Sequence, residues 1–259
     1  MFLDLAISDF FAFLLILFRI AGLMLTAPFL GARNIPPQVQ IGFSLILALL
    51  IFPTVPRAGF VLPENLGVFV VAVLSEMGIG AIIGFVASLF FAAVQSAGMI
   101  VDQELGFSLA NVLDPVSNEQ VSIIGHLKNI LALLVFLGIN GHHLLLEALT
   151  RSFSVVPLMG LRFSKVLQNL VTVHAAGALF EIAVQLAAPV LVAVFLATVA
   201  LALVARTVPE MNVFIMGFSI RIAVGFVVLL MFVPIFAHIF VQLTGRMGTE
   251  INALTDAMR

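Results

Sequence analysis

Four charged side chains lie inside otherwise apolar stretches of this sequence: Arg19, Glu76, Glu181 and Arg221. An isolated charge within a bilayer costs at least about 2–3 kcal/mol unless it is paired or hydrated. We therefore expect these side chains to find partners inside an assembly, on the same chain or on other subunits. The alternative is a transport role, in which the acidic groups titrate along an ion path or a proton relay.

A short histidine motif is a weaker candidate for chemistry. His143 and Glu147 are one helical turn apart and can in principle share a metal ion, but no third ligand is evident. The sequence contains no GxSxG elbow, P-loop or GxGxxG, and it has no cysteine. We therefore predict no catalytic residue, no metal site and no cofactor.

Six apolar stretches must position these side chains: 10–31, 39–52, 66–101, 121–149, 166–205 and 213–243. The chain of 259 residues is 63% hydrophobic, with a mean hydropathy of +1.26, more than a soluble domain can cover. Crossing about 30 Å of hydrocarbon takes about 20 helical residues, and backbone groups in lipid must be satisfied within the segment. We predict an all-α, membrane-associated assembly of long helices and helical hairpins.

Two of these helices are longer than a bilayer requires. At 1.5 Å per residue, 66–101 and 166–205 would measure roughly 54 and 60 Å if continuous, so each must bend, tilt or project from the membrane. Pro189 and Pro234 lie inside apolar runs and predict kinks. Small residues recur at every fourth position of the third stretch, which predicts close approach of another helix. They are Gly80, Gly84, Ser88, Ala92 and Ser96.

The segment 106–120 differs from its surroundings because it begins apolar and ends in turn residues. Asp114-Pro115 and Ser117-Asn118 discourage a continued helix. One interpretation is a solvated connecting loop. The other is a re-entrant segment at membrane depth, which is tolerated only where it is buried in protein or lines a cavity.

Four groups of residues, taken in order, resemble the FliR family of flagellar type III export-gate subunits, whose injectisome counterparts are the SctT proteins. The groups are Arg19 with Ala27-Pro28 and Arg33-Asn34-Ile35-Pro36; Gly106-Phe107 through Asp114-Pro115; Asn140-Gly141-His142; and 206–214 leading to Gly217-Phe218. The resemblance spans essentially the whole chain. Ser219 stands where a proline is expected, so this helix should be less kinked.

The resemblance implies a function that composition alone does not. FliR-like proteins join FliP and FliQ in a helical assembly around a pore for unfolded export substrates, and FlhB associates with the same gate. Residues 1–165 would then be a FliP-like part and 166–259 a FliQ-like hairpin, with the junction near 165–175. The expected location is the bacterial inner membrane, in contact with lipid, at the flagellar basal body.

The resemblance also assigns residues. A plug loop that helps close the pore would contain Gly106, Phe107, Leu109, Val112, Leu113, Asp114, Pro115 and Asn118. A turn at the substrate entrance, in contact with FlhB, would contain Arg206, Pro209, Glu210 and Asn212.

Two functions of different classes therefore remain open. One is the export-gate subunit, and the other is a stand-alone secondary transporter or channel that uses the intramembrane charges. Transporters usually have matching halves with paired broken helices, and no convincing repeat relates 1–130 to 131–259. The net charge of −2, with 11 basic residues, offers no cationic face for a phosphate backbone, so we expect no nucleic-acid partner.

Overall fold

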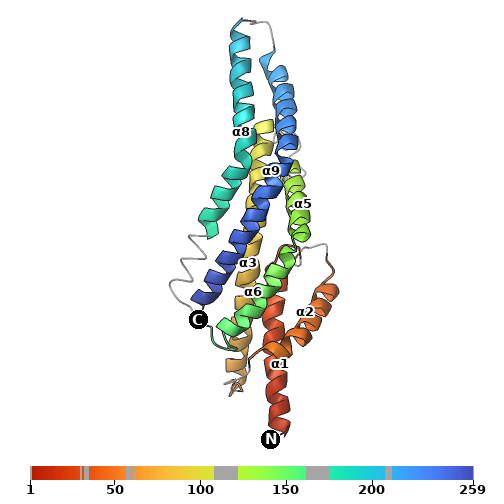
Figure 1. Ribbon diagram of the computed structural model, residues 1–259, viewed down its shortest axis with the longest axis vertical. Helices are drawn as coiled ribbons and strands as arrows, with labels where there is room; N and C mark the ends of the chain where they lie inside the picture. The colour runs from red at the N-terminus through yellow and green to blue at the C-terminus, as the bar shows by residue number, and fades with distance from the viewer. Residues whose placement is uncertain are drawn as a thin grey trace. The chain divides into compact units, whose positions relative to one another are not determined.

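The computed structural model describes residues 2–29, 31, 35–56, 60, 62–107, 122–161, 175–207 and 212–258. Within these ranges all regular structure is helical and no strand occurs, which confirms the predicted all-α class (Figure 1). The helices are α1 (Phe2–Thr26), α2 (Pro37–Ile51), the 3₁₀ turn η1 (Phe52–Thr54), α3 (Leu66–Leu105), α5 (Ile123–Gly138), α6 (Gly141–Val155), α8 (Ala175–Thr207) and α9 (Val213–Ala257).

Five helical stretches are long and apolar enough to cross a membrane, or six if α5 and α6 are counted together as one broken span. The five are Ile7–Thr26, Pro37–Thr54, Leu66–Leu105, Gly177–Thr207 and Ile215–Ala257. This agrees with the prediction of a membrane protein with about six apolar segments.

Three helices are at least about one and a half times as long as the hydrocarbon core is thick. α3, α8 and α9 contain 40, 33 and 45 residues, or roughly 60, 50 and 68 Å at 1.5 Å per residue, against about 30 Å for the hydrocarbon core. The helical conformation continues through Pro189 in α8 and Pro234 in α9. The predicted excess of helix over membrane thickness is therefore present.

Two boundaries differ from the apolar stretches of the sequence. The stretch 121–149 is divided into α5 and α6 at Asn140, whose left-handed φ of 57° interrupts the helical backbone. α9 continues past residue 243 to Ala257. Its last part is amphipathic rather than uniformly apolar, and it buries Met247, Ile251 and Leu254 at helical spacing.

The chain forms two compact units. The first comprises Met1–Leu89, Asn140–Ala176 and Thr244–Arg259, and the second comprises Phe90–Ile139 and Gly177–Leu243. α3 and α9 each contribute to both units. The junction expected near 165–175 lies mostly outside the described residues, which omit 162–174.

In the first unit, α1 and α3 touch through their backbones. A Cβ atom at Gly22, Gly80 or Gly84 would overlap backbone or side-chain atoms of the facing helix. At the same crossing the Thr26 hydroxyl donates a hydrogen bond to the Ala81 carbonyl oxygen at 3.0 Å. The predicted ridge of small residues therefore allows close helix approach at Gly80 and Gly84, within this chain.

In the second unit, α3 meets α5 and α9. The backbones of α3 and α5 approach closely at Gly98 and Gly125, where an added Cβ would overlap the partner glycine's backbone. About two turns earlier in α3, the Phe91 ring contacts Phe136 and Phe240 edge to face, with centroid separations of 5.4 and 5.6 Å. These three helices form the core of the unit.

α8 and α9 leave most of their apolar surface uncovered. Only 17% of the candidate span in α8 and 22% of that in α9 is buried, compared with 56% in α3. The exposed side chains of α8 include Phe180, Val192, Phe195, Leu196 and Leu203. Lipid or other proteins must cover these faces in a membrane.

Candidate functional sites

Arg19 and Glu76 form a buried ion pair in the first unit. Both side chains are 0% exposed, and the Arg19 Nε atom lies 2.6 Å from Glu76 Oε2. Arg19 comes from α1 and Glu76 from α3. The pair therefore joins the same two helices that touch through their glycines.

α6 and the residue after it complete the surroundings of Arg19. Nη1 donates to the Ser152 hydroxyl at 3.2 Å, and Nη2 donates to the Val156 carbonyl oxygen at 3.1 Å. The guanidinium carbon lies 4.3 Å from the ring centroid of Phe153, within the range of a cation–π contact. Each nitrogen of the guanidinium thus has a partner in the interior.

Glu76 receives a second hydrogen bond from the turn that follows α6. The Met159 backbone N–H donates to Glu76 Oε1 at 2.9 Å, and Met159 itself adopts a left-handed φ of 64°. Both carboxylate oxygens are therefore engaged. Because both side chains are fully buried and each of their charged-group N and O atoms has a partner, the pair favours a structural role over a titrating relay.

Glu181 and Arg221 are placed differently. Glu181 is exposed on α8, and Arg221 is half-buried on α9 with a buried Nε atom. Among the described residues, Glu181 and Arg221 form no ion pair, and the Arg221 Nε has no hydrogen-bond partner. Within the described residues, the structure therefore pairs two of the four predicted intramembrane charges and shows no ion pair for the other two.

Most of the expected plug loop lies outside the described residues, which omit 108–121. Six of its predicted residues are therefore not placed: Leu109, Val112, Leu113, Asp114, Pro115 and Asn118. The other two end α3. Gly106 adopts a left-handed φ of 88°, and the Phe107 ring packs edge to face on Phe226 with centroids 6.3 Å apart.

A buried carboxylate ties the two ends of this segment together. Asp102, 6% exposed near the end of α3, accepts hydrogen bonds from the Ser122 hydroxyl and from the Ile124 backbone N–H. Ser122 in turn caps α5 by accepting a hydrogen bond from the Gly125 N–H at 2.8 Å. The residue after the segment is thus fixed to the helix before it.

Lys128 is a further buried charge, and it was not among the four intramembrane charges predicted from the sequence. Its side chain is 4% exposed on α5, and Nζ donates to the Leu186 carbonyl oxygen of α8 at 3.1 Å. Leu186 belongs to the turn that precedes Pro189, where the proline ring disturbs the helical hydrogen bonds. Pro189 has no N–H to donate to the Gln185 carbonyl oxygen, so the ammonium group adds a donor to the turn in which the helix loses one.

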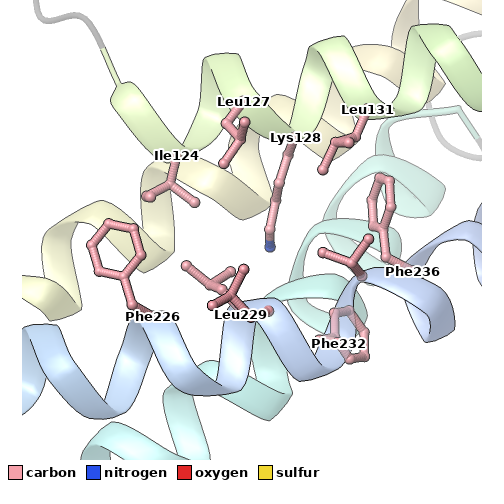
Figure 2. A pocket seen from close by; sticks show the side chains of 10 residues that line it. Ile124, Leu127, Lys128, Leu131, Phe226, Leu229, Phe232 and Phe236 are labelled. Atoms are coloured by element: carbon pink, nitrogen blue, oxygen red, sulfur yellow. The ribbon is translucent and has the colours of Figure 1, made fainter.

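A cavity of about 100 Å³ lies beside Lys128, between α5 and α9. Figure 2 shows the Lys128 side chain extending from α5 into the space that faces α9. Lys128 is the one polar residue of the lining. The others are Ile124, Leu127 and Leu131 on α5, and Phe226, Leu229, Leu230, Phe232, Val233 and Phe236 on α9.

The ends of the predicted entrance turn are described, but its centre is not. Arg206 is exposed in the last turn of α8, and Asn212 caps α9 by accepting a hydrogen bond from the Ile215 N–H at 3.3 Å. Pro209 and Glu210 fall within 208–211, outside the described residues. Near this turn a Cβ at Gly217 would lie 3.9 Å from Leu201, so α8 and α9 pack together as a hairpin.

The histidine motif lies at the start of α6. In the part of the chain that the structure describes, no group of three or more His, Cys, Asp or Glu side chains could hold a metal ion. His142 and His143 contact each other, with ring centroids 4.3 Å apart.

Sequence signals for the missed residues were present. Ser122 precedes Gly125 by three residues at the start of an apolar run, which is the spacing of a helix N-cap. Lys128 lies inside the stretch 121–149 as clearly as Arg19 lies inside 10–31. It is therefore an intramembrane charge by the same criterion.

Comparisons with known proteins agree with the resemblance to FliR. The chain is 36% identical to the flagellar biosynthetic protein FliR of Bacillus subtilis (strain 168) over 259 residues, covering 98% of this chain and 97% of the relative. FliR of Escherichia coli (strain K12) is 28% identical over 243 residues, 92% of each chain. The Yop proteins translocation protein T of Yersinia pestis is 32% identical over 195 residues, 74% of this chain and 73% of that protein.

The family assignment covers nearly the whole sequence. Residues 10–247 match the family described as bacterial export proteins, family 1. The matched region includes Arg19 and Glu76, the segment 106–122, Lys128 and the α8–α9 hairpin. The chain is a member of this family of bacterial export proteins.

Proposed function

We propose that this chain is a non-enzymatic subunit of the flagellar type III protein export gate, in the bacterial inner membrane at the flagellar basal body. It joins FliP and FliQ to form a pore through which unfolded flagellar proteins pass. The observation that carries the proposal is the similarity to proteins named FliR, which extends over 98% of this chain in one relative and 92% in another.

The uncovered helices support assembly with other proteins. α8 and α9 are the most apolar of the candidate spans and are only 17% and 22% buried. Glu181 and Arg221, which form no ion pair with any residue that the structure describes, add charge to the same two helices. Partner helices would cover the apolar faces and supply counter-charges, whereas lipid alone would leave each charge at an energetic cost.

The segment 106–122 is the proposed plug of the pore. A pore wide enough for an unfolded polypeptide would leak ions at rest, so a displaceable obstruction is needed. Leu109, Val112 and Leu113 would supply apolar bulk, and Asp114-Pro115 would keep the segment from becoming helical. The Asp102–Ser122 contact would hold its ends while the middle moves.

The turn between α8 and α9 is the proposed entrance site and contact for FlhB. Arg206 presents an exposed cation there, and Glu210 follows four residues later. Opposite charges on a short turn between two long apolar helices suit a polar contact at the membrane surface. The transporter alternative gains no support from the buried Arg19–Glu76 pair, because both charges are already satisfied.

Coexpression tests the proposal directly. The tagged chain, produced with FliP and FliQ, should purify with both in one complex, and deleting its gene should stop secretion of flagellar proteins. Restoring the gene should restore both. If the chain purifies without FliP and FliQ, or if cells that lack it still export flagellin, the proposed function is wrong.

A further inference from the structure

The cavity beside Lys128 is bordered by two apolar stripes. Exposed apolar side chains on α5 follow one another at intervals of four, three and four residues, and the exposed α9 side chains that line the cavity follow at intervals of four and three. They are Ile123, Leu127, Ile130 and Leu134 on α5, and Phe226, Leu230 and Val233 on α9. This is the spacing of side chains along a seam between packed helices, so the two stripes and the hollow between them form a groove suited to a third helix.

The floor of this groove carries a positive charge with unused hydrogen-bonding capacity. An ammonium group has three donors, and the structure assigns one of them to the Leu186 carbonyl oxygen. Asp102 interacts electrostatically with Lys128, but its oxygens accept hydrogen bonds from Ser122 and Ile124. No ion pair between Asp102 and Lys128 occurs in the described part of the chain. A cation in apolar surroundings is complementary to an anionic group brought by the occupant.

We propose that the groove between α5 and α9 receives an apolar transmembrane helix of another subunit, and that a carboxylate on that helix pairs with Lys128. The inference rests on the proposed function, because the partner is a subunit of the same membrane assembly. The cavity of about 100 Å³ is smaller than the roughly 150 Å³ that accommodates benzene in an engineered apolar cavity, so it fits one side chain. An acyl chain would need a longer channel, and it would not require the regular spacing of the stripes.

A charge swap combined with crosslinking tests this pairing in flagellated cells that produce the full chain. A photo-crosslinking residue is placed at Leu230, which is 70% exposed on the rim of the groove. It should crosslink to a subunit of the complex through a helix that carries an Asp or Glu. Lys128→Glu should lower this crosslink at least about tenfold, and Lys128→Met should lower it less, because reversal adds repulsion to the loss of the pair. Replacing the partner's carboxylate with Lys should restore the crosslink in the Lys128→Glu background.

Three results would overturn the inference. The first is that Lys128→Met and Lys128→Glu are equally harmful, that no charge reversal in a partner rescues them, and that Lys128→Gln behaves as wild type. In that case Lys128 only supports the turn of Leu186. If the residue at position 230 labels lipid alone, the groove is a lipid site. If Lys128→Glu leaves crosslinking and export unchanged in cells that need the chain for export, the pairing is absent while the proposed function stands. A chain that is dispensable for export would instead refute the proposed function.

Discussion

Removing one member of the Arg19–Glu76 pair should open the first unit. Arg19→Met leaves the Glu76 carboxylate 0% exposed, with the Met159 N–H as its remaining partner in the described residues. Breaking a buried pair in this way costs about 3–5 kcal/mol, since an uncompensated charge stays in the interior. At 1.4 kcal/mol per tenfold change, the population of opened molecules should rise roughly 10²- to 10³-fold. Glu76→Leu should have a similar effect, because it leaves the guanidinium with neutral partners alone.

Cysteine labelling measures this opening. The chain has no cysteine, so Ala12→Cys introduces one thiol at a fully buried position of α1, two turns from Arg19. Where local opening precedes reaction, the labelling rate in isolated membranes reports the free energy of opening. The Ala12→Cys chain with an intact pair is the matched reference, and both single variants should label roughly 10²- to 10³-fold faster.

The double variant decides whether the two residues act as a pair. Arg19→Met combined with Glu76→Leu removes both charges, so it should label more slowly than either single variant. It should still label faster than the reference, because the Val156 carbonyl and the Met159 N–H lose their partners. Additive effects, with the double variant fastest of all, would refute the reasoning.

Four further predictions follow from other parts of the chain. Gly80→Ala should accelerate the same labelling about tenfold or more, because its Cβ overlaps the backbone of the facing helix. The control Gly78→Ala, with no described atom of a facing helix within 4 Å of its Cβ, should not, and equal rates for the two variants would contradict the close helix contact. Produced without partners, the chain should aggregate or be degraded, and a monodisperse, protease-resistant monomer in mild detergent would count against an obligate assembly. Replacing 108–120 with a short Gly/Ser linker should give an assembled complex that conducts small ions at rest, and a complex as tight as wild type would show that the segment only connects α3 to α5. Charge reversal at Arg206 and Glu210 should reduce export without dissolving the purified complex, and loss of the complex would indicate a packing role for the turn.

The long helices were predictable because their apolar runs are continuous. α3 begins at the predicted residue 66 and ends four residues beyond the predicted boundary, because Asp102-Gln103-Glu104 is polar but still helical. The last part of α9 was missed for the same kind of reason, since its buried residues are separated by polar ones and the mean hydropathy falls. The break at Asn140 was not predicted, because a single left-handed residue does not change the hydropathy of the run.

The buried charges were predictable as positions but not as pairs. Arg19 and Glu76 are 57 residues apart, and their contact depends on how α1 packs on α3. The partners at Val156 and Met159 are backbone groups, which carry no side-chain signal. Glu181 gave the same sequence signal as Glu76 but is exposed on α8, because apolar periodicity does not say which face a partner will cover.

The hydrogen bonds of Asp102 also set the reach of the segment that connects α3 to α5. Its ends are held by neighbouring contacts, since the Phe107 N–H bonds to the Asp102 carbonyl oxygen and the Ser122 hydroxyl bonds to the Asp102 side chain. Fifteen peptide steps separate Phe107 from Ser122, and a chain extends by at most about 3.3–3.6 Å per step. Because both ends are held at one place, no part of the connecting chain can lie more than about 25 Å from Asp102. Whatever this segment binds or obstructs must therefore lie within that distance of the ends of α3 and α5.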